Sequence, residues 1–237
     1  MYTDRPAGVS PVGGAPEASY HHAVLVLSYL LITMLGYALG GVPTGYLAGR
    51  LRGVDIRRHG SGNVGGTNAL RVLGLGVGVT VMAVDVAKGY VAAGLLPLLP
   101  ILVGEPVCLG LCAGLGAVVG HVFTPYLRFR GGKGVAAAAG VFLALAPLPT
   151  AVAAGVFVFL TFATGIVSVG SLGASVALPV AALLLQVVAG IPLHPAVGAL
   201  TVGLVPFVAY THRTNIRRLV AGTENRFRRF WERGGRG

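Results

Sequence analysis

The sequence predicts an all-α fold, a polytopic integral membrane helix bundle. Hydrophobic residues make up 54% of the 237 positions, charged residues only 11%, and the mean hydropathy is +0.79. Apolar runs recur at about 20 residues, which is the length of helix that crosses a hydrocarbon core. No stretch shows the sustained apolar–polar alternation of membrane β-strands. The 38 glycines suit closely packed helices in lipid, because small residues let backbones approach.

The apolar segments can be placed in order along the chain. The first span is predicted over residues 23–49, with Pro43 bending or ending it. GVPTGYLAG in this span carries two overlapping GxxxG spacings, which favour close packing over a specific dimer contact. A basic loop, 50–66, follows, and 68–103 is expected to contain a short or broken helix. Further breaks fall at residues 97–100, 104–106, 147–149, 165–171 and 190–195.

The cations set the predicted topology. Most of the 18 Lys and Arg residues lie in three clusters, Arg50–Arg58, Arg128–Lys133 and Arg213–Arg236. Each cluster adjoins an apolar segment, as the positive-inside rule expects of cytoplasmic loops. An even number of crossings must then separate the clusters, which gives seven transmembrane helices, or five as the alternative. The N-terminus is predicted outside, with the C-terminus and the polar loops cytoplasmic. This placement beside membrane segments favours anionic lipid over nucleic acid as the partner of the positive charge.

Composition divides the chain into three parts. Residues 1–22 are predicted to be a disordered N-terminal extension, 23–226 a single membrane domain, and 227–237 a basic tail on anionic lipid. Cys108 and Cys112 are four residues apart in an apolar run, with no His or Cys near them in sequence. We predict two buried small side chains there and no metal site.

Ionisable residues within the apolar stretch 68–103 need partners or a cavity. Asp85 and Lys88 are three residues apart and would share a helix face, so we expect an internal ion pair in preference to a catalytic role. Arg71 has no carboxylate nearby in sequence and adjoins a glycine-rich segment. This position favours a bound anion.

Two glycine-rich loops on the predicted cytoplasmic side have the composition of phosphate-binding loops. GSGNVGGTN, 60–68, combines flexible glycines with polar side chains and leads into a predicted helix, whose N-terminus can hold a phosphate. GGKG, 131–134, adds a point charge at Lys133 but lacks the Walker A spacing, so nucleotide hydrolysis is not expected. Each loop alone could be a simple turn, whereas two on the same side favour phosphate binding.

A third polar segment is THRTNIRRLVAGTENR, 211–226. His212 and Asn215 would share a helix face, and by itself the segment could be an amphipathic helix lying on anionic lipid. No GxSxG motif is present and aspartates are scarce, so a Ser–His–Asp hydrolase has little support. The residue types fit chemistry in which cations and N–H groups stabilise phosphates without a covalent enzyme intermediate.

These three segments together resemble the bacterial acyl-phosphate:glycerol-3-phosphate acyltransferases, the PlsY family. The matching signatures are GSGNVGGTNALRVLG, FRGGKGVAAAAG and THRTNIRRLVAGTE, supported by VPTGYLAGR and VDVAKG. The resemblance covers about residues 24–226. It implies transfer of an acyl group from acyl-phosphate to the 1-hydroxyl of glycerol 3-phosphate, in the bacterial inner membrane. It also implies that no cofactor or metal is needed and that an acyl-phosphate-making enzyme supplies the donor.

The family's site residues carry over onto matching positions of this chain. The resemblance implies that the catalytic residues are Ser61, Arg71, Lys133, His212 and Asn215. It implies that the substrate-binding residues are Asn63, Thr67, Asn68, Gly131, Gly132, Gly134, Ser168, Ser171 and Glu224. Gly66 stands where the family usually has Ala, which should loosen the first loop slightly.

The expected mechanism brings two mutually repelling anions together. Arg71, Lys133 and the N–H-rich loops would offset the repulsion and align the hydroxyl with the acyl carbon. A substrate phosphate is favoured as the proton acceptor, with His212 orienting. A transporter of organic phosphates and a lipid-binding scaffold are the alternatives, because both also use basic loops. Against a transporter, the polar motifs sit at one face and no inverted repeat is visible.

Overall fold

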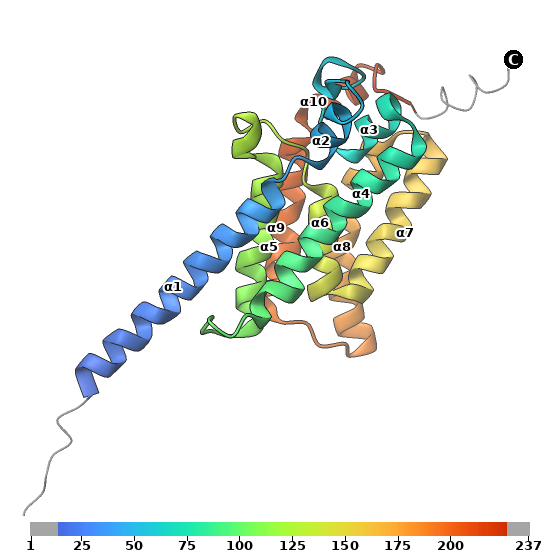
Figure 1. Ribbon diagram of the computed structural model, residues 1–237. Helices are drawn as coiled ribbons and strands as arrows, with labels where there is room; N and C mark the ends of the chain where they lie inside the picture. Colours follow the sequence, from blue (N-terminus) through green and yellow to red (C-terminus); the bar gives the residue numbers. More distant parts are fainter. Residues whose placement is uncertain (1–13, 227–237) are drawn as a thin grey trace, which may run out of the picture.

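The apolar segments form α-helices, in which each segment pairs its own backbone polar groups, as the interior of a bilayer requires. The computed structural model describes residues 14–226, with side chains from residue 19, as a helix bundle (Figure 1). The helices that make up the bundle are α1 (Gly14–Gly41), α4 (Leu75–Tyr90), α5 (Pro106–Val122), α6 (Val135–Leu145), α7 (Pro147–Thr164), α8 (Val167–Ala189) and α9 (Pro195–Thr211). The short helices α2 (Thr44–Arg50), α3 (Gly66–Leu73) and α10 (Arg213–Val220) gather at one end, which we call the polar end.

The structure confirms a multi-pass helical protein but not the predicted number of spans. Within residues 14–226, five helical stretches are long and apolar enough to cross a membrane. A sixth is obtained if α9 and α10 count as one span bent by 65°. The prediction of seven is therefore not confirmed, because α6 is apolar but has only 11 residues.

The first helix begins earlier than predicted. Residues 14–22 continue α1 as helix, whereas the sequence predicted a disordered extension up to residue 22. Helix propagation explains the difference, because each added residue extends an existing helix at little cost. Residues 1–13 and the predicted basic tail, 227–237, lie outside the described residues.

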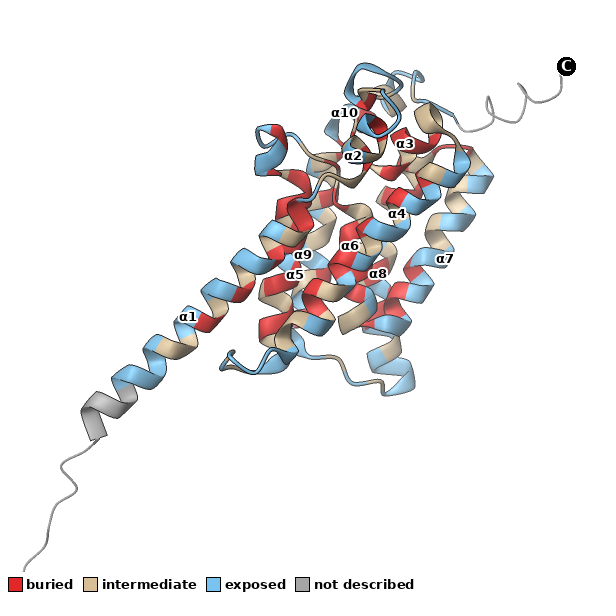
Figure 2. Cartoon of the chain, in the orientation of Figure 1, coloured by how far each residue is buried: buried red, intermediate tan, exposed pale blue. Residues whose placement is uncertain are grey.

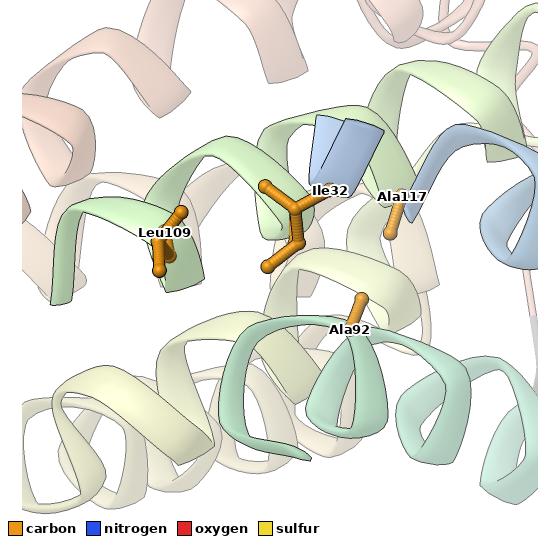
Figure 3. Packing of buried hydrophobic residues seen from close by; sticks show 5 residues of the cluster. Ile32, Ala92, Leu109 and Ala117 are labelled. Carbon is orange, nitrogen blue, oxygen red and sulfur yellow. The ribbon is translucent and has the colours of Figure 1, made fainter. Parts of the chain in front are cut away.

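Small residues hold α1 against α5. A side chain at Gly36 or Gly40 of α1 would collide with the backbone of Ala113 or Ala117 in α5. In lipid no hydrophobic driving force holds helices together, so the van der Waals contacts of this close approach stabilise the pair instead. A buried cluster of Ile32, Ala92, Leu109, Ala113 and Ala117 fills the contact between α1, α5 and the π-helical segment Val91–Leu95 that follows α4 (Figure 3). Many of the exposed residues are large and hydrophobic, as expected of surfaces that face lipid, and Figure 2 colours exposed positions along α1 and α7.

Breaks between helices separate the short helices of the polar end from the helices of the bundle. Pro43 separates α1 from α2, as predicted. Gly74, with φ at 92°, separates α3 from α4 and confirms the predicted broken helix. The GxxxG glycines have a different use from helix–helix packing, since Gly45 and Gly49 lie against the backbone of Val64 and Val54. Gly45 lets the first glycine-rich loop pack tightly on α2, and Gly49 does the same for the chain at Val54 and Ile56.

Candidate functional site

The first glycine-rich loop is folded around one buried asparagine. The Asn68 side-chain oxygen accepts a hydrogen bond from the Ser61 backbone N–H at 2.8 Å. Its amide donates to the carbonyls of Ile56 and His59 at 2.9 and 3.1 Å. Asn63 similarly accepts from the Gly65 N–H at 2.8 Å. Asn63 and Asn68, predicted to contact substrate, therefore shape the loop through these oxygen and nitrogen atoms.

The second glycine-rich loop is docked on the end of α5. The Gly131 and Gly132 N–H groups donate to the carbonyls of Val122 and His121 at 2.9 and 3.0 Å. A side chain at Gly132 would collide with the His121 ring, so only glycine fits there. Gly134 caps α6 with φ at 82°, a conformation that glycine adopts without strain. These contacts fix the position of Lys133 between two ordered glycines.

Glu224 joins the third segment to α8. Its carboxylate accepts hydrogen bonds from Asn215 at 2.6 Å, from Arg218 at 2.7 Å and from Ser168 at 3.2 Å. Burial opposes the charged form of Glu224, but the hydrogen bonds from Arg218 and Asn215 leave its pKa below the usual value. Arg218 was not singled out from the sequence, because its basic neighbours made it look like part of a lipid-facing cluster.

Asn215 has one unused acceptor. The residue is 4% exposed, and its amide nitrogen is engaged by Glu224. Its side-chain oxygen is buried without a hydrogen-bond partner among the described residues. Buried polar atoms are rarely left unpaired, so this oxygen is suited to a donor from a bound molecule.

Two cavities meet between these segments. The inner cavity, about 300 Å³, is walled mainly by apolar residues, among them Val86, Ala138, Phe142, Ala153, Leu178 and Leu204. The outer cavity, about 600 Å³, is lined by the basic residues Arg57, Arg58, Arg130, Lys133 and Arg218. Four polar residues line both cavities, namely Ser61, Asn63, Lys133 and Asn215. An apolar chamber thus adjoins a cationic one, with polar side chains at the junction.

Most of the predicted site residues line the inner cavity. They are Ser61, Asn63, Thr67, Asn68, Arg71, Lys133, Gly134, Ser168, Ser171, Asn215 and Glu224. Gly131 lines only the outer cavity. Gly132 and His212 line neither of these two cavities.

His212 is a buried neighbour of the site and does not belong to its wall. It is 2% exposed and ends α9. Its Nδ1 lies 2.9 Å from the Val208 carbonyl oxygen, which fits a ring that donates from Nδ1. His212 therefore holds the turn between α9 and α10, from which Asn215 reaches the cavities.

Two half-buried cations at the site, Arg71 and Lys133, make no ion pair with any described residue. Within residues 14–226, no carboxylate lies within 4.0 Å of the charged groups of Arg71 or Lys133. Burial lowers the pKa of Lys133 to about 8, with Glu224 opposing this shift and Arg218 and Arg71 adding to it. Burial also lowers the pKa of Arg71 from its usual value. A bound anion would relieve both effects.

A second polar cluster, which we call the closed group because its charges pair with each other, lies in the wall of the inner cavity, which Asp85 and His121 line. Lys88 and Asp85 pair at 2.9 Å, which confirms the predicted ion pair. Thr44 donates to Asp85 at 2.9 Å, and Lys88 donates to the Val42 carbonyl at 2.9 Å. His121 lies 3.7 Å from the same carboxylate oxygen. No sequence pattern pointed to His121, which is far from Asp85 along the chain and lies in an apolar run.

A multi-pass membrane fold with a cationic chamber opening into an apolar one defines a class of membrane proteins that handle anionic amphiphiles. Comparison with known proteins narrows the class. Residues 30–222 match the family model described as glycerol-3-phosphate acyltransferase. The chain therefore belongs to the glycerol-3-phosphate acyltransferase family of the PlsY type.

Curated relatives and solved structures agree with this assignment. Glycerol-3-phosphate acyltransferase of Chlorobaculum parvum is 40% identical over 227 residues, covering 85% of this chain and 97% of the relative. That of Geobacter sulfurreducens is 40% identical over 207 residues, covering 86% and 100%. The crystal structure of PlsY, an integral membrane glycerol 3-phosphate acyltransferase, in its glycerol 3-phosphate form aligns with a TM-score of 0.73 at 34% identity, covering 84% of this chain and 96% of that one. Its lysophosphatidic acid form aligns with a TM-score of 0.72 at 34% identity.

Proposed function

We propose that this protein transfers an acyl group from acyl-phosphate to the 1-hydroxyl of sn-glycerol 3-phosphate, giving lysophosphatidic acid and inorganic phosphate. The observation that carries the proposal is the junction of the two cavities at Ser61, Lys133 and Asn215. The reaction needs a place where a soluble phosphate ester meets the head of an oily molecule. The cationic outer cavity suits the first substrate, and the apolar inner cavity suits the acyl chain.

Each polar group at the junction has a role in this proposal. Arg71 and Lys133 offset the charge of two phosphate groups, because neither cation has a carboxylate at contact distance in the described part of the chain. The unpaired Asn215 oxygen accepts a hydrogen bond from the attacking hydroxyl and orients it. Ser61, whose backbone is held by Asn68, adds a hydroxyl donor for a phosphate oxygen.

The chemical step balances without a protein base. The glycerol 3-phosphate oxygen forms a bond to the acyl carbon, the bond between that carbon and the phosphate oxygen breaks, and the hydroxyl proton leaves on the released phosphate. His212 acts as a positioning residue, since it lines neither cavity and contacts Val208. A His212→Gln variant should keep the shape of the wild-type rate–pH profile, whereas loss of its inflection near a histidine pKa would assign His212 as the base.

The proposed topology has seven passes, with the short α6 as a half-length seventh. Figure 1 supports it, because the long helices run alternately between the polar end and the opposite end. The positive-inside rule puts the basic polar end in the cytoplasm and the start of α1 outside the bacterial inner membrane. The donor is an activated acyl compound, so an acyl-phosphate-making enzyme must act first.

The assay that tests the proposal uses purified protein, acyl-phosphate and glycerol 3-phosphate. Release of phosphate and formation of lysophosphatidic acid in equal amounts is the expected result. An Arg71→Met variant should lose most activity, while Arg50→Met, which removes an exposed arginine on α2, should keep it. Glycerol 3-phosphate uptake by proteoliposomes without any acyl transfer would favour the transporter and overturn the proposal.

A further inference from the structure

A second group of chemically versatile side chains lies at the end of the bundle opposite the cavities. Glu105 is the N-cap of α5, Cys108 lies in the first turn of that helix, and His194 is the N-cap of α9. One ligand atom from each side chain lies within 4.8 Å of the other two. Figure 1 shows the starts of α5 and α9 at this end of the bundle, away from α2, α3 and α10.

The sequence-based prediction for Cys108 is wrong in one respect, its burial. Cys108 is half-exposed, where a buried small side chain was expected, and it is a free thiol. A histidine also lies beside it, although none is near it in sequence. His194 is brought there by the packing of α9 against α5, which no local spacing of ligands reveals.

The backbone at this group is well defined. Glu105 precedes Pro106 and His194 precedes Pro195, and a proline at the first helical position fixes its own φ. The Glu105 carboxylate accepts hydrogen bonds from the N–H groups of Val107 at 3.1 Å and Cys108 at 2.7 Å. These bonds hold the carboxylate over the first turn of α5. Each carboxylate oxygen has a second lone pair for another partner.

We propose that Glu105, Cys108 and His194 form a binding site for a divalent transition metal ion, with Zn²⁺ as the ligand. Thiolate, imidazole and carboxylate are the protein ligands of zinc, at about 2.3, 2.0 and 2.1 Å respectively. Ligand atoms around such an ion are about 3.5 Å apart, so movements of about 1 Å close the site. Water would complete a tetrahedron. Mg²⁺ and Ca²⁺ are disfavoured, because they prefer an all-oxygen set.

Binding would change two contacts at the site. The thiol of Cys108 would lose its proton, because the thiolate is the ligand. The Ala196 N–H donates a hydrogen bond to Nδ1 of His194 at 3.3 Å. This long bond is weak, so metal binding can break it at little cost. The ion would then join the N-terminal ends of two helices that are far apart in the sequence. Helix capping explains Glu105, and the Cys108 thiol hydrogen-bonds to the same carboxylate, but neither contact gives a reason for an imidazole beside the pair.

The test uses full-length protein from which any affinity tag has been removed, because a histidine tag binds zinc. After chelator treatment, zinc is titrated against a chromophoric chelator, and bound metal is counted by elemental analysis. One zinc ion per chain is expected, with a dissociation constant of about 10 μM or tighter. Cobalt substitution should give a thiolate-to-cobalt charge-transfer band, which reports directly on the sulfur ligand.

Matched variants decide between this site and adventitious binding. Cys108→Ser and His194→Gln should each weaken zinc binding by at least tenfold and remove the cobalt–thiolate band. Cys112→Ser is the control, since Cys112 lies one turn further along α5 and packs toward α1, and it should bind like wild type. Equal binding by Cys108→Ser and wild type, or no stoichiometric zinc at about 100 μM, would overturn the proposal. Acyl transfer is assayed separately, and its outcome does not bear on this result.

Discussion

Two groups of charged residues lie close together near the polar end, and they differ in how their charges are balanced. In the closed group, Asp85 is 2% exposed and Lys88 is 5% exposed. Asp85 accepts a hydrogen bond from Thr44, and Lys88 donates one to the Val42 carbonyl. In the second group, which we call the open group, Arg71 and Lys133 are half-buried, and no carboxylate in residues 14–226 lies at contact distance from them. A satisfied pair fixes structure, whereas unbalanced cations make a site for anions.

The largest effect is expected from breaking the closed group. Lys88→Met leaves the Asp85 carboxylate buried without its cation, which should cost about 3–5 kcal/mol in the free energy of unfolding. Thermal denaturation in detergent, followed by size-exclusion chromatography, measures the loss. Asp85→Asn combined with Lys88→Met should recover most of it, because the uncompensated charge is gone. A Lys88→Met protein as stable as wild type would show that the pair is not a structural element.

The opposite pattern is expected in the open group. Lys133→Met should lower kcat/KM by about 10²–10³-fold, the loss typical of removing one group that stabilises developing charge. Its melting temperature should stay the same or rise, because one of two neighbouring unpaired cations has been removed. Arg50→Met serves as the control for removing a positive charge at this end. If Lys133→Met unfolded readily, Lys133 would belong with the structural group.

Lys133 should also set the basic limb of the rate–pH profile. Its pKa of about 8 means that the side chain is charged below pH 8 and loses its charge as the pH rises through that value. The kcat/KM should therefore fall up to tenfold per pH unit above about pH 8. Lys133→Arg keeps its charge, so its profile should stay flat to a higher pH, whatever its absolute rate. An unchanged limb in that variant would assign the titration to another group.

A smaller effect is expected from the arginine pair on α10. Arg218 holds Glu224, and through it Asn215, at 2.7 and 2.6 Å. Arg218→Gln should loosen Asn215 and raise the KM for glycerol 3-phosphate several-fold. Its neighbour Arg217 is exposed, so Arg217→Gln should behave like wild type. Steady-state kinetics at fixed ionic strength compares the two, and equal effects would mean that only the overall basic charge matters.

The sequence predicted those features that depend on local patterns. Apolar runs predicted the membrane helices, and Pro43 predicted the break between α1 and α2. The i,i+3 spacing of Asp85 and Lys88 predicted their ion pair, which the structure confirms. It missed contacts made by tertiary packing. His121 beneath Gly132 and His194 beside Cys108 come from distant helices. The roles of Asn63 and Asn68 follow from the folded loop and not from its sequence, because a polar loop residue can bind either a ligand or its own loop.

Arg71 and Lys133 are assigned here as the cations that bind the anionic substrate. The most direct test is the shift in melting temperature that glycerol 3-phosphate causes at constant ionic strength. Wild-type protein and Arg50→Met should be stabilised by several degrees at saturating ligand, because the anion neutralises Arg71 and Lys133. Lys133→Met should show little or no shift, although it is folded. Equal stabilisation of all three proteins would contradict the account, since the ligand would then bind without the cation to which its binding is assigned.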